Sequence, residues 1–160
     1  FLMLSATITG TIITKYENAF QTLPLLVSFI PMLMDTGGNC GSQSSTLIIR
    51  GIAVDEIRFH DLFKVVFKEF RVAVLVGFVL AAVNGLRIML IYHSLRMAVL
   101  IGLSLIATII LAKIVGCCLP LLAKKIGLDP AIMAAPLITT LVDTCSILIY
   151  FNIATHLFSL

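Results

Sequence analysis

The sequence predicts an all-α integral membrane protein, and three observations lead to that class. Of its 160 residues, 60% are hydrophobic and only 12% are charged, with a mean hydropathy of +1.14. The apolar residues gather in stretches near the ~20 residues that cross a bilayer. Lys and Arg concentrate on one side of these stretches. A chain this apolar is not expected to be a soluble domain, and its formal charge of +3 is no sign of a nucleic-acid partner.

Four stretches are long enough to cross the membrane, over residues 23–49, 72–92, 97–123 and 131–160. Residues 1–14 are apolar but too short, and the chain begins with Phe. We therefore expect them to be the end of a truncated first span. The chain would then be a five-helix membrane domain, residues 1–160, of a longer protein.

Basic residues predict the orientation of these spans, because cytoplasmic loops carry an excess of Lys and Arg. The basic residues on the first side are Arg50, Arg58, Lys64, Lys68, Arg71, Lys124 and Lys125. The opposite side offers Lys15, Arg96 and Arg87. We expect a protein of the cell membrane in which the first group faces the cytoplasm. The N-terminal side would then lie in the cytoplasm and Leu160 outside the cell.

We expect the two middle spans, residues 72–92 and 97–123, to have a structural role rather than to bind an ion. Before them, apolar residues recur at helical spacing between Ile57 and Arg71 and predict an amphipathic helix at the cytoplasmic interface. Within the spans, Asn84, Arg87 and Lys113 stand among Leu, Val, Ile and Ala. We expect Lys113 to reach the cytoplasmic headgroups rather than a ligand.

A polar run lies inside the span 23–49. A carboxylate is costly in hydrocarbon, so Asp35 is a functional candidate. If the run is helical, one stripe carries four oxygen-bearing side chains, Asp35, Asn39, Ser42 and Thr46. This stripe predicts a path for an ion or solute.

Three glycines in the same run leave two explanations open. Gly37, Gly38 and Gly41 predict a broken or loosely wound backbone, which is tolerated in a membrane only against protein or a water-filled cavity. Alternatively, they form a packing face for a neighbouring helix. Packing explains the glycines but not Asp35 and Asn39 together, so we favour the ion path.

The last span holds the second intramembrane carboxylate, Asp143. Pro136 has no amide hydrogen, so we expect the carbonyl of Ile132 to lose its partner and the helix to kink. Asp143 follows two turns later with Thr139 and no basic residue in the span. It therefore needs a cation, or a proton and a hydrogen bond to another helix.

The chemistry of these groups favours a hard cation. Few carboxylates, many neutral oxygens and no thiolate or imidazole cluster suit Mg²⁺, which keeps several waters, whereas Ca²⁺ takes more direct ligands. If two chains met across a two-fold axis, two copies of Asp143 would face one hydrated ion.

An enzyme is the competing interpretation. Asp35-Thr36-Gly37 matches the loop of soluble pepsin-like proteases, and an intramembrane aspartyl protease would need Asp35 and Asp143 to share a proton. Neither residue lies in the Gly-x-Gly-Asp context of such proteases. We therefore expect no enzyme.

Longer motifs match one transporter family. They are Pro31, Thr36-Gly37-Gly38-Asn39, Gly41, Gln43, Ser45-Thr46-Leu47-Ile48-Ile49-Arg50, Lys68-Glu69, Gly127-Leu128-Asp129-Pro130-Ala131, Pro136-Leu137, Thr140-Leu141, Asp143 and Leu148-Ile149-Tyr150-Phe151. On these motifs the chain resembles the transmembrane domain of the MgtE family of magnesium transporters.

The resemblance implies a pore-forming homodimer of five-helix subunits that transports Mg²⁺. The second and fifth helices would line the pore, and Asp143 of each subunit would face the hydrated ion beside the backbone carbonyl of Thr139. The pore-lining positions would be Asp35, Gly37, Gly38, Asn39, Pro136 and Thr140. Many family members carry Gly where Asp35 stands, so Asp143 is the better-supported ligand.

The resemblance also implies cytoplasmic regulatory domains upstream, which close the pore when intracellular magnesium is high. The identity of the ion stays open among Mg²⁺, Mn²⁺, Co²⁺ and Ca²⁺. Oxygen sites for these ions differ in size and hydration rather than in residue type.

Overall fold

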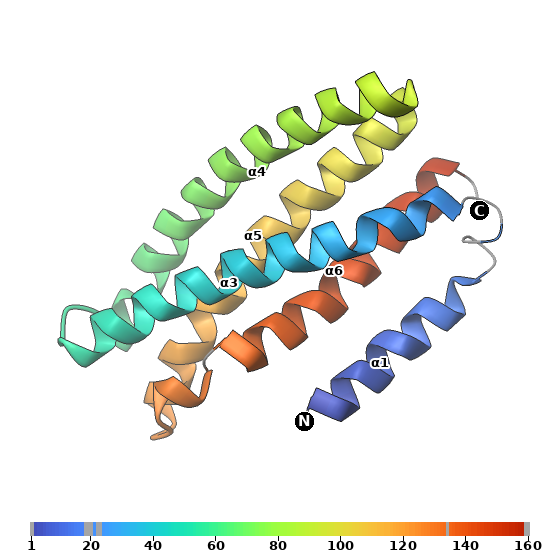
Figure 1. Ribbon diagram of the computed structural model, residues 1–160. Helices are drawn as coiled ribbons and strands as arrows, with labels where there is room; N and C mark the ends of the chain where they lie inside the picture. The colour runs from blue at the N-terminus through green and yellow to red at the C-terminus, as the bar shows by residue number, and fades with distance from the viewer. Residues whose placement is uncertain (1, 18–20, 22–23, 134, 159–160) are drawn as a thin grey trace.

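The computed structural model describes the chain except for residues 1, 18–20, 22–23, 134 and 159–160. The described residues form α-helices and short 3-10 helices (η) without a strand, which confirms the all-α class (Figure 1). In chain order the elements are α1 (Leu2–Lys15), η1 (Pro24–Phe29), α3 (Ile30–Ala53), η2 (Phe59–Asp61), α4 (Leu62–Tyr92), α5 (Leu95–Lys125), η3 (Pro130–Met133) and α6 (Ala135–Phe158).

Among the described residues, three helical segments are long and apolar enough to cross a membrane: Phe59–Tyr92, Leu95–Lys125 and Pro136–Phe158. They coincide with the last three predicted spans. The expected limits Leu23 and Leu160 lie outside the described residues. Helix α3 has 24 residues, but its polar run lowers its hydropathy, and α1 has only 14. The five-span count therefore stays a prediction.

Helix α5 is the centre of the bundle. It packs against α4, α3 and α6, while α1 joins the bundle along α6 (Figure 1). Leu100 and Ile101 of α5 are buried with Tyr150 and Phe151 of α6 in the largest apolar cluster. The Tyr150 hydroxyl donates to the carbonyl of Leu26 at 2.9 Å, so α6 is tied to the segment that leads into α3.

The prediction that glycines break the second span is wrong, because α3 is one continuous helix from Ile30 to Ala53. A Cβ on Gly37 would lie 2.6 Å from Thr108 Cγ2 of α5. A Cβ on Gly41 would lie 2.8 Å from Ile138 Cγ2 of α6. The glycines therefore let three helices approach closely, as the packing explanation requires.

The expected kink at Pro136 is also wrong. Helix α6 begins at Ala135, so Pro136 stands in the first turn, where a missing amide hydrogen leaves no helical bond unmade. Ile132 belongs to the separate helix η3. The carbonyl of Pro136 accepts hydrogen bonds from the hydroxyls of Thr140, at 2.6 Å, and Thr139, at 3.2 Å.

Residues 62–71 are not a separate interfacial helix, as the sequence led us to expect, but the first turns of α4 itself. On one side, Leu62 and Val66 pack against the cluster around Ile48 of α3 and Leu121 of α5. On the other side, Phe63 is 87% exposed. The amphipathic pattern thus marks the end of a spanning helix.

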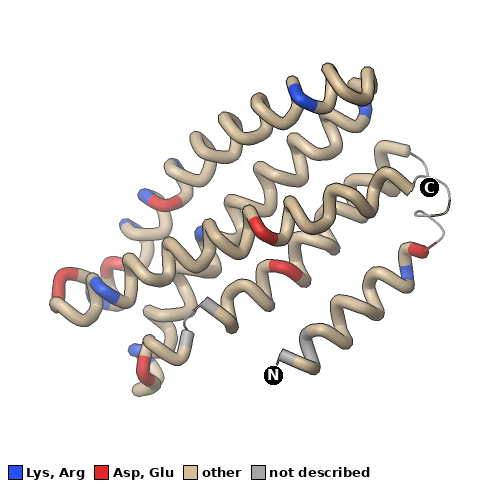
Figure 2. Tube along the Cα trace, viewed as in Figure 1, with Lys and Arg blue, Asp and Glu red and all other residues tan. Residues whose placement is uncertain are grey.

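Lys and Arg gather at the end of the bundle where α3 turns into α4 (Figure 2). In that turn Asp55 adopts a left-handed backbone, with φ of 56°. Arg58 Nη2 donates to Asp55 Oδ2 at 2.6 Å, and this hydrogen bond lowers the pKa of the carboxyl. Both side chains are exposed, so their ion pair adds little stability.

Candidate cation site

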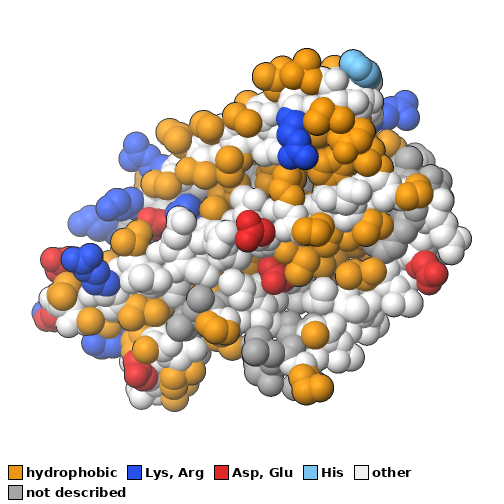
Figure 3. All heavy atoms as spheres, viewed as in Figure 1, with side chains coloured by type: hydrophobic (Ala, Val, Ile, Leu, Met, Phe, Trp, Pro, Cys, Tyr) orange, Lys and Arg blue, Asp and Glu red, His pale blue; other side chains and the backbone are white. Residues whose placement is uncertain are grey.

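A small hollow of about 180 Å³ lies where α3 passes α6. Acidic side chains of the two helices lie side by side at the centre of the face shown in Figure 3. The residues that line the hollow are Met34, Asp35, Gly38, Asn39, Thr139 and Asp143. The structure therefore brings both intramembrane carboxylates to one place.

The hollow is kept open beside Asp143 by a glycine. A Cβ on Gly38 would lie 3.1 Å from Thr139 Cγ2 and 3.7 Å from Asp143 Oδ1. Across the hollow, Asn39 Nδ2 donates to Asp35 Oδ1 at 3.1 Å, one helical turn away. The amide thus orients the Asp35 carboxylate and leaves its other oxygen open to a ligand.

Neither Asp35 nor Asp143 forms an ion pair with a basic side chain among the described residues. No hydrogen bond in this part of the chain joins Asp35 to Asp143, as a shared proton would require. Two carboxylates without a counter-ion in a membrane helix bundle favour the binding of a cation.

A second hollow, of about 450 Å³, continues along the open face of α3. Its lining residues are Asn39, Ser42, Gln43, Thr46 and Leu47. Because α3 is helical, the predicted stripe from Asp35 to Thr46 does share one face, and Asn39 belongs to both hollows. Asp35, Asn39 and Thr46 are exposed.

The other predicted positions do not line these hollows. Gly37 is buried against α5 and α6 on the inner side of α3. Thr140 is buried, with its hydroxyl on the Pro136 carbonyl, while Pro136 is exposed at the start of α6. The Thr139 hydroxyl is also turned to its own helix, which leaves its side chain without a free donor.

Sequence reasoning missed a buried charge cluster on the opposite face of α3. The expectation that Lys113 reaches the headgroups is wrong, because its side chain is 9% exposed and lies inside the bundle. Lys113 Nζ donates to Glu69 Oε2 of α4 at 2.9 Å and to Ser44 Oγ of α3 at 3.1 Å. The Ser44 hydroxyl in turn donates to Glu69 Oε2 at 2.8 Å.

The register of α4 against α5, which only the structure gives, explains this cluster. Gly77 lies against Ile106, and Gly102 faces Ala81. Extending this antiparallel register puts Glu69 level with Lys113. An acid and a base at equal depth on adjacent helices indicate a pair rather than two separate snorkelling side chains.

Comparison with known proteins gives a consistent answer. The family model for MgtE, described as a divalent cation transporter, matches residues 30–153. The chain is 35% identical to the magnesium transporter MgtE of Thermus thermophilus over 153 aligned residues. The alignment covers 96% of this chain and 34% of that protein.

Two further relatives bear the same name. The Bacillus subtilis protein is 34% identical over 154 residues, covering 96% of this chain and 34% of its own length. The Enterococcus faecalis protein is 36% identical over 151 residues, with 92% and 32% covered. The chain thus spans about a third of these relatives, which are transporters rather than enzymes. With its apolar helices it is a multi-pass membrane protein, and it belongs to the MgtE family of divalent cation transporters.

Proposed function

We propose that this chain is the ion-conducting domain of a magnesium transporter in the cell membrane. The observation that carries the proposal is the hollow in which Asp35 and Asp143 lie without a basic partner among the described residues. A cation drawn to two carboxylates and several neutral oxygens is hard and oxygen-seeking. The three relatives are named magnesium transporters, which supports Mg²⁺ as that ion.

The ion is held with most of its water. The hollow has room for several waters beside two carboxylates. Such outer-sphere contacts are weak enough to release the ion, as conduction requires. In this scheme Asp143 attracts the hydrated ion and Asp35 adds a second charge. The backbone carbonyl of Thr139 accepts a hydrogen bond from its water shell.

Two copies of the chain complete the path. The polar stripe of α3 is exposed on one subunit, and polar side chains in a bilayer must face protein or water. A second subunit related by a two-fold axis covers the stripe with its own α3 and α6. The pore then runs between the subunits.

Ion flux tests the site. Proteoliposomes containing the protein take up Mg²⁺, and Asp143→Asn lowers the initial rate by roughly tenfold or more, since one charge per subunit is lost. The matched control is Asp55→Asn, which removes the same charge in the exposed turn, where Asn tolerates the left-handed backbone. Equal flux in both variants would remove Asp143 from the path.

Cross-linking tests the dimer. In a background without the native cysteines, Gln43→Cys in the exposed second hollow forms an intersubunit disulfide, whereas Phe78→Cys on the outer surface of α4 does not. Cross-linking at Phe78 alone would place the interface on α4 and overturn the proposed pore.

Competition tests the ion. A hydrated-ion site that holds Mg²⁺ is less sensitive to Mn²⁺, Co²⁺ and Ca²⁺ than a site with direct ligands. Inhibition of Mg²⁺ uptake at a tenth of its concentration by one of these ions would assign the transporter to that ion instead.

A further inference from the structure

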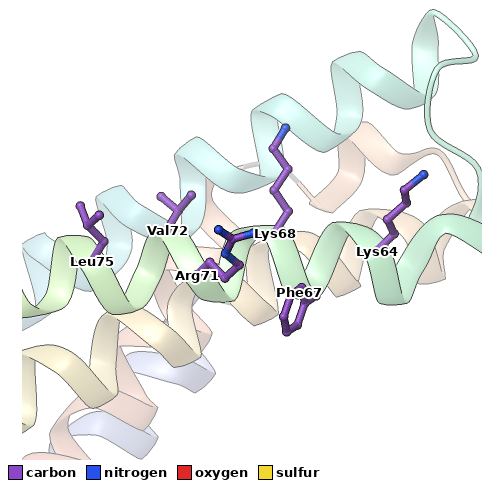
Figure 4. A pocket seen from close by; sticks show the side chains of 6 residues that line it. All are labelled: Lys64, Phe67, Lys68, Arg71, Val72 and Leu75. Atoms are coloured by element: carbon purple, nitrogen blue, oxygen red, sulfur yellow. The ribbon is translucent and has the colours of Figure 1, made fainter.

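The first turns of α4 carry a groove that is separate from the cation site. It has a volume of about 390 Å³ and is drawn in Figure 4. The residues that line it are Lys64, Phe67, Lys68, Arg71, Val72 and Leu75. One end of the groove is therefore cationic and the other apolar.

The three basic residues act from one side of the helix. Lys64, Lys68 and Arg71 recur at i, i+4 and i+7, which places them along one face over about 10 Å. Figure 4 shows the side chains of Lys64 and Lys68 extending to the same side of α4. Like charges at this spacing repel one another, so the face favours an anion.

No carboxylate forms an ion pair with this face within the described part of the chain. The nearest acid in sequence, Glu69, is turned to the other side, where it binds Lys113 and Ser44. None of the described ion pairs includes Lys64, Lys68 or Arg71. All three side chains are exposed, so they are available to a ligand.

The length of α4 indicates where the groove lies relative to the bilayer. Its 31 residues extend about 46 Å, well beyond the ~30 Å of a hydrocarbon core. Apart from Asn84 and Arg87, no polar side chain interrupts the helix from Val72 to Tyr92, a length of about 31 Å. The basic residues therefore lie at headgroup level, while Val72 and Leu75 lie among acyl chains.

We propose that this groove is a binding site for an anionic phospholipid. The phosphate lies between Lys64, Lys68 and Arg71, where the guanidinium can donate two parallel hydrogen bonds. One acyl chain follows Val72 and Leu75, of which Leu75 is 67% exposed. Cations above apolar side chains at the membrane boundary match the charge and shape of such a lipid.

A second copy of the chain is a poorer occupant. In a two-fold contact the same patch meets itself, which would bring six cations together without a neutralising acid. A free phosphate or nucleotide would use the basic residues but leave the apolar half of the groove without a role.

Lipid binding tests the proposal directly. The purified protein in neutral detergent is titrated with phosphatidylglycerol and with phosphatidylcholine, and bound lipid is counted by native mass spectrometry. The groove variant carries Lys64→Gln, Lys68→Gln and Arg71→Gln. The matched control carries Arg50→Gln, Lys124→Gln and Lys125→Gln, which removes the same charge from exposed positions at the same end.

We expect the preference for phosphatidylglycerol over phosphatidylcholine to fall at least tenfold in the groove variant and to stay unchanged in the control. An equal loss in both variants, or none in the groove variant, would overturn the site. Circular dichroism and gel filtration verify that both variants are folded. The readout is bound lipid rather than ion flux, so its failure is distinct from failure of the proposed function.

A second arm identifies the source of the phosphate. Leu75→Asn weakens phosphatidylglycerol binding severalfold if an acyl chain lies in the groove, and inorganic phosphate at millimolar concentration does not displace the lipid. Displacement by inorganic phosphate together with unchanged binding in Leu75→Asn would show a simple anion site and refute the lipid.

Discussion

Opposite faces of α3 handle charge in opposite ways. On the inner face, Ser44 meets a carboxylate and an ammonium that neutralise each other, with Lys113 only 9% and Glu69 13% exposed. On the outer face, Asp35 meets a second carboxylate, Asp143, in a hollow without a basic residue. The inner cluster contains its own counter-ion, whereas the outer one has no basic side chain among the described residues.

The difference shows how a buried carboxylate is assigned a role. A charge that has its own counter-ion on a neighbouring helix contributes to specifying the packing, and removing one partner is costly. A charge without such a partner is available for a mobile ion. Glu69 and Asp143 are both acids in apolar helices, and only their neighbours distinguish them.

A basic side chain placed beside Asp143 should have the largest effect on Mg²⁺ uptake. In Thr139→Lys, the new ammonium stands one turn before Asp143 and can pair with it as Lys113 pairs with Glu69. Mg²⁺ uptake into proteoliposomes should then fall by roughly tenfold or more. Thr139→Met, of similar length without charge, serves as the control. If both variants block uptake equally, bulk rather than charge closes the site.

Breaking the inner pair should reduce stability instead. Lys113→Met leaves the Glu69 carboxylate with the Ser44 hydroxyl but without its counter-ion, which should lower the free energy of unfolding by about 3 kcal/mol. Thermal unfolding in detergent measures this loss. The double variant Lys113→Met with Glu69→Gln should recover most of it. A single variant as stable as the parent would mean that the pair contributes nothing to packing.

Two adjacent glycines separate packing from the hollow. Gly37→Ala forces a Cβ to within 2.6 Å of Thr108 and 2.8 Å of Val142, which should cost about 1–2 kcal/mol of stability. Gly38→Ala meets Thr139 at 3.1 Å, so its stability should change by less than about 1 kcal/mol while uptake falls as the hollow narrows. The reverse ranking in unfolding measurements would contradict this assignment of faces.

The smallest effect is expected at the Thr139 hydroxyl. It donates to the Pro136 carbonyl within α6, and in the proposed mechanism only the backbone carbonyl of Thr139 faces the ion. Thr139→Val keeps the shape, so the uptake rate should change by less than about twofold. A loss comparable to that of Asp143→Asn would mean that the hydroxyl itself meets the ion.

The candidate site was largely predictable, because its signals are local. Asp35 and Asn39 are one turn apart, as are Thr139 and Asp143, so each pair shares a face of its own helix wherever that helix packs. A polar stripe in an apolar chain also indicates which face needs water or protein. The meeting of the two pairs in one hollow was expected only through the family resemblance.

The errors concern positions where a neighbouring helix overrides a local tendency. Glycine weakens an isolated helix, but Gly37 and Gly41 permit close packing against α5 and α6, and α3 is one continuous helix. Pro136 would kink a helix interior, but α6 starts beside it. Lys113 can snorkel on a single helix, but Glu69 lies within reach on the next one.

The sequence by itself determined the helical class, three of the spans and the position of two acids within predicted spans, because hydropathy and charge act residue by residue along one helix. Only the tertiary structure decided that Glu69 is neutralised while Asp35 and Asp143 lie together without a cation. That outcome depends on the register and rotation of α3, α4, α5 and α6 against one another. Packing between helices sets both quantities, and no single segment contains them.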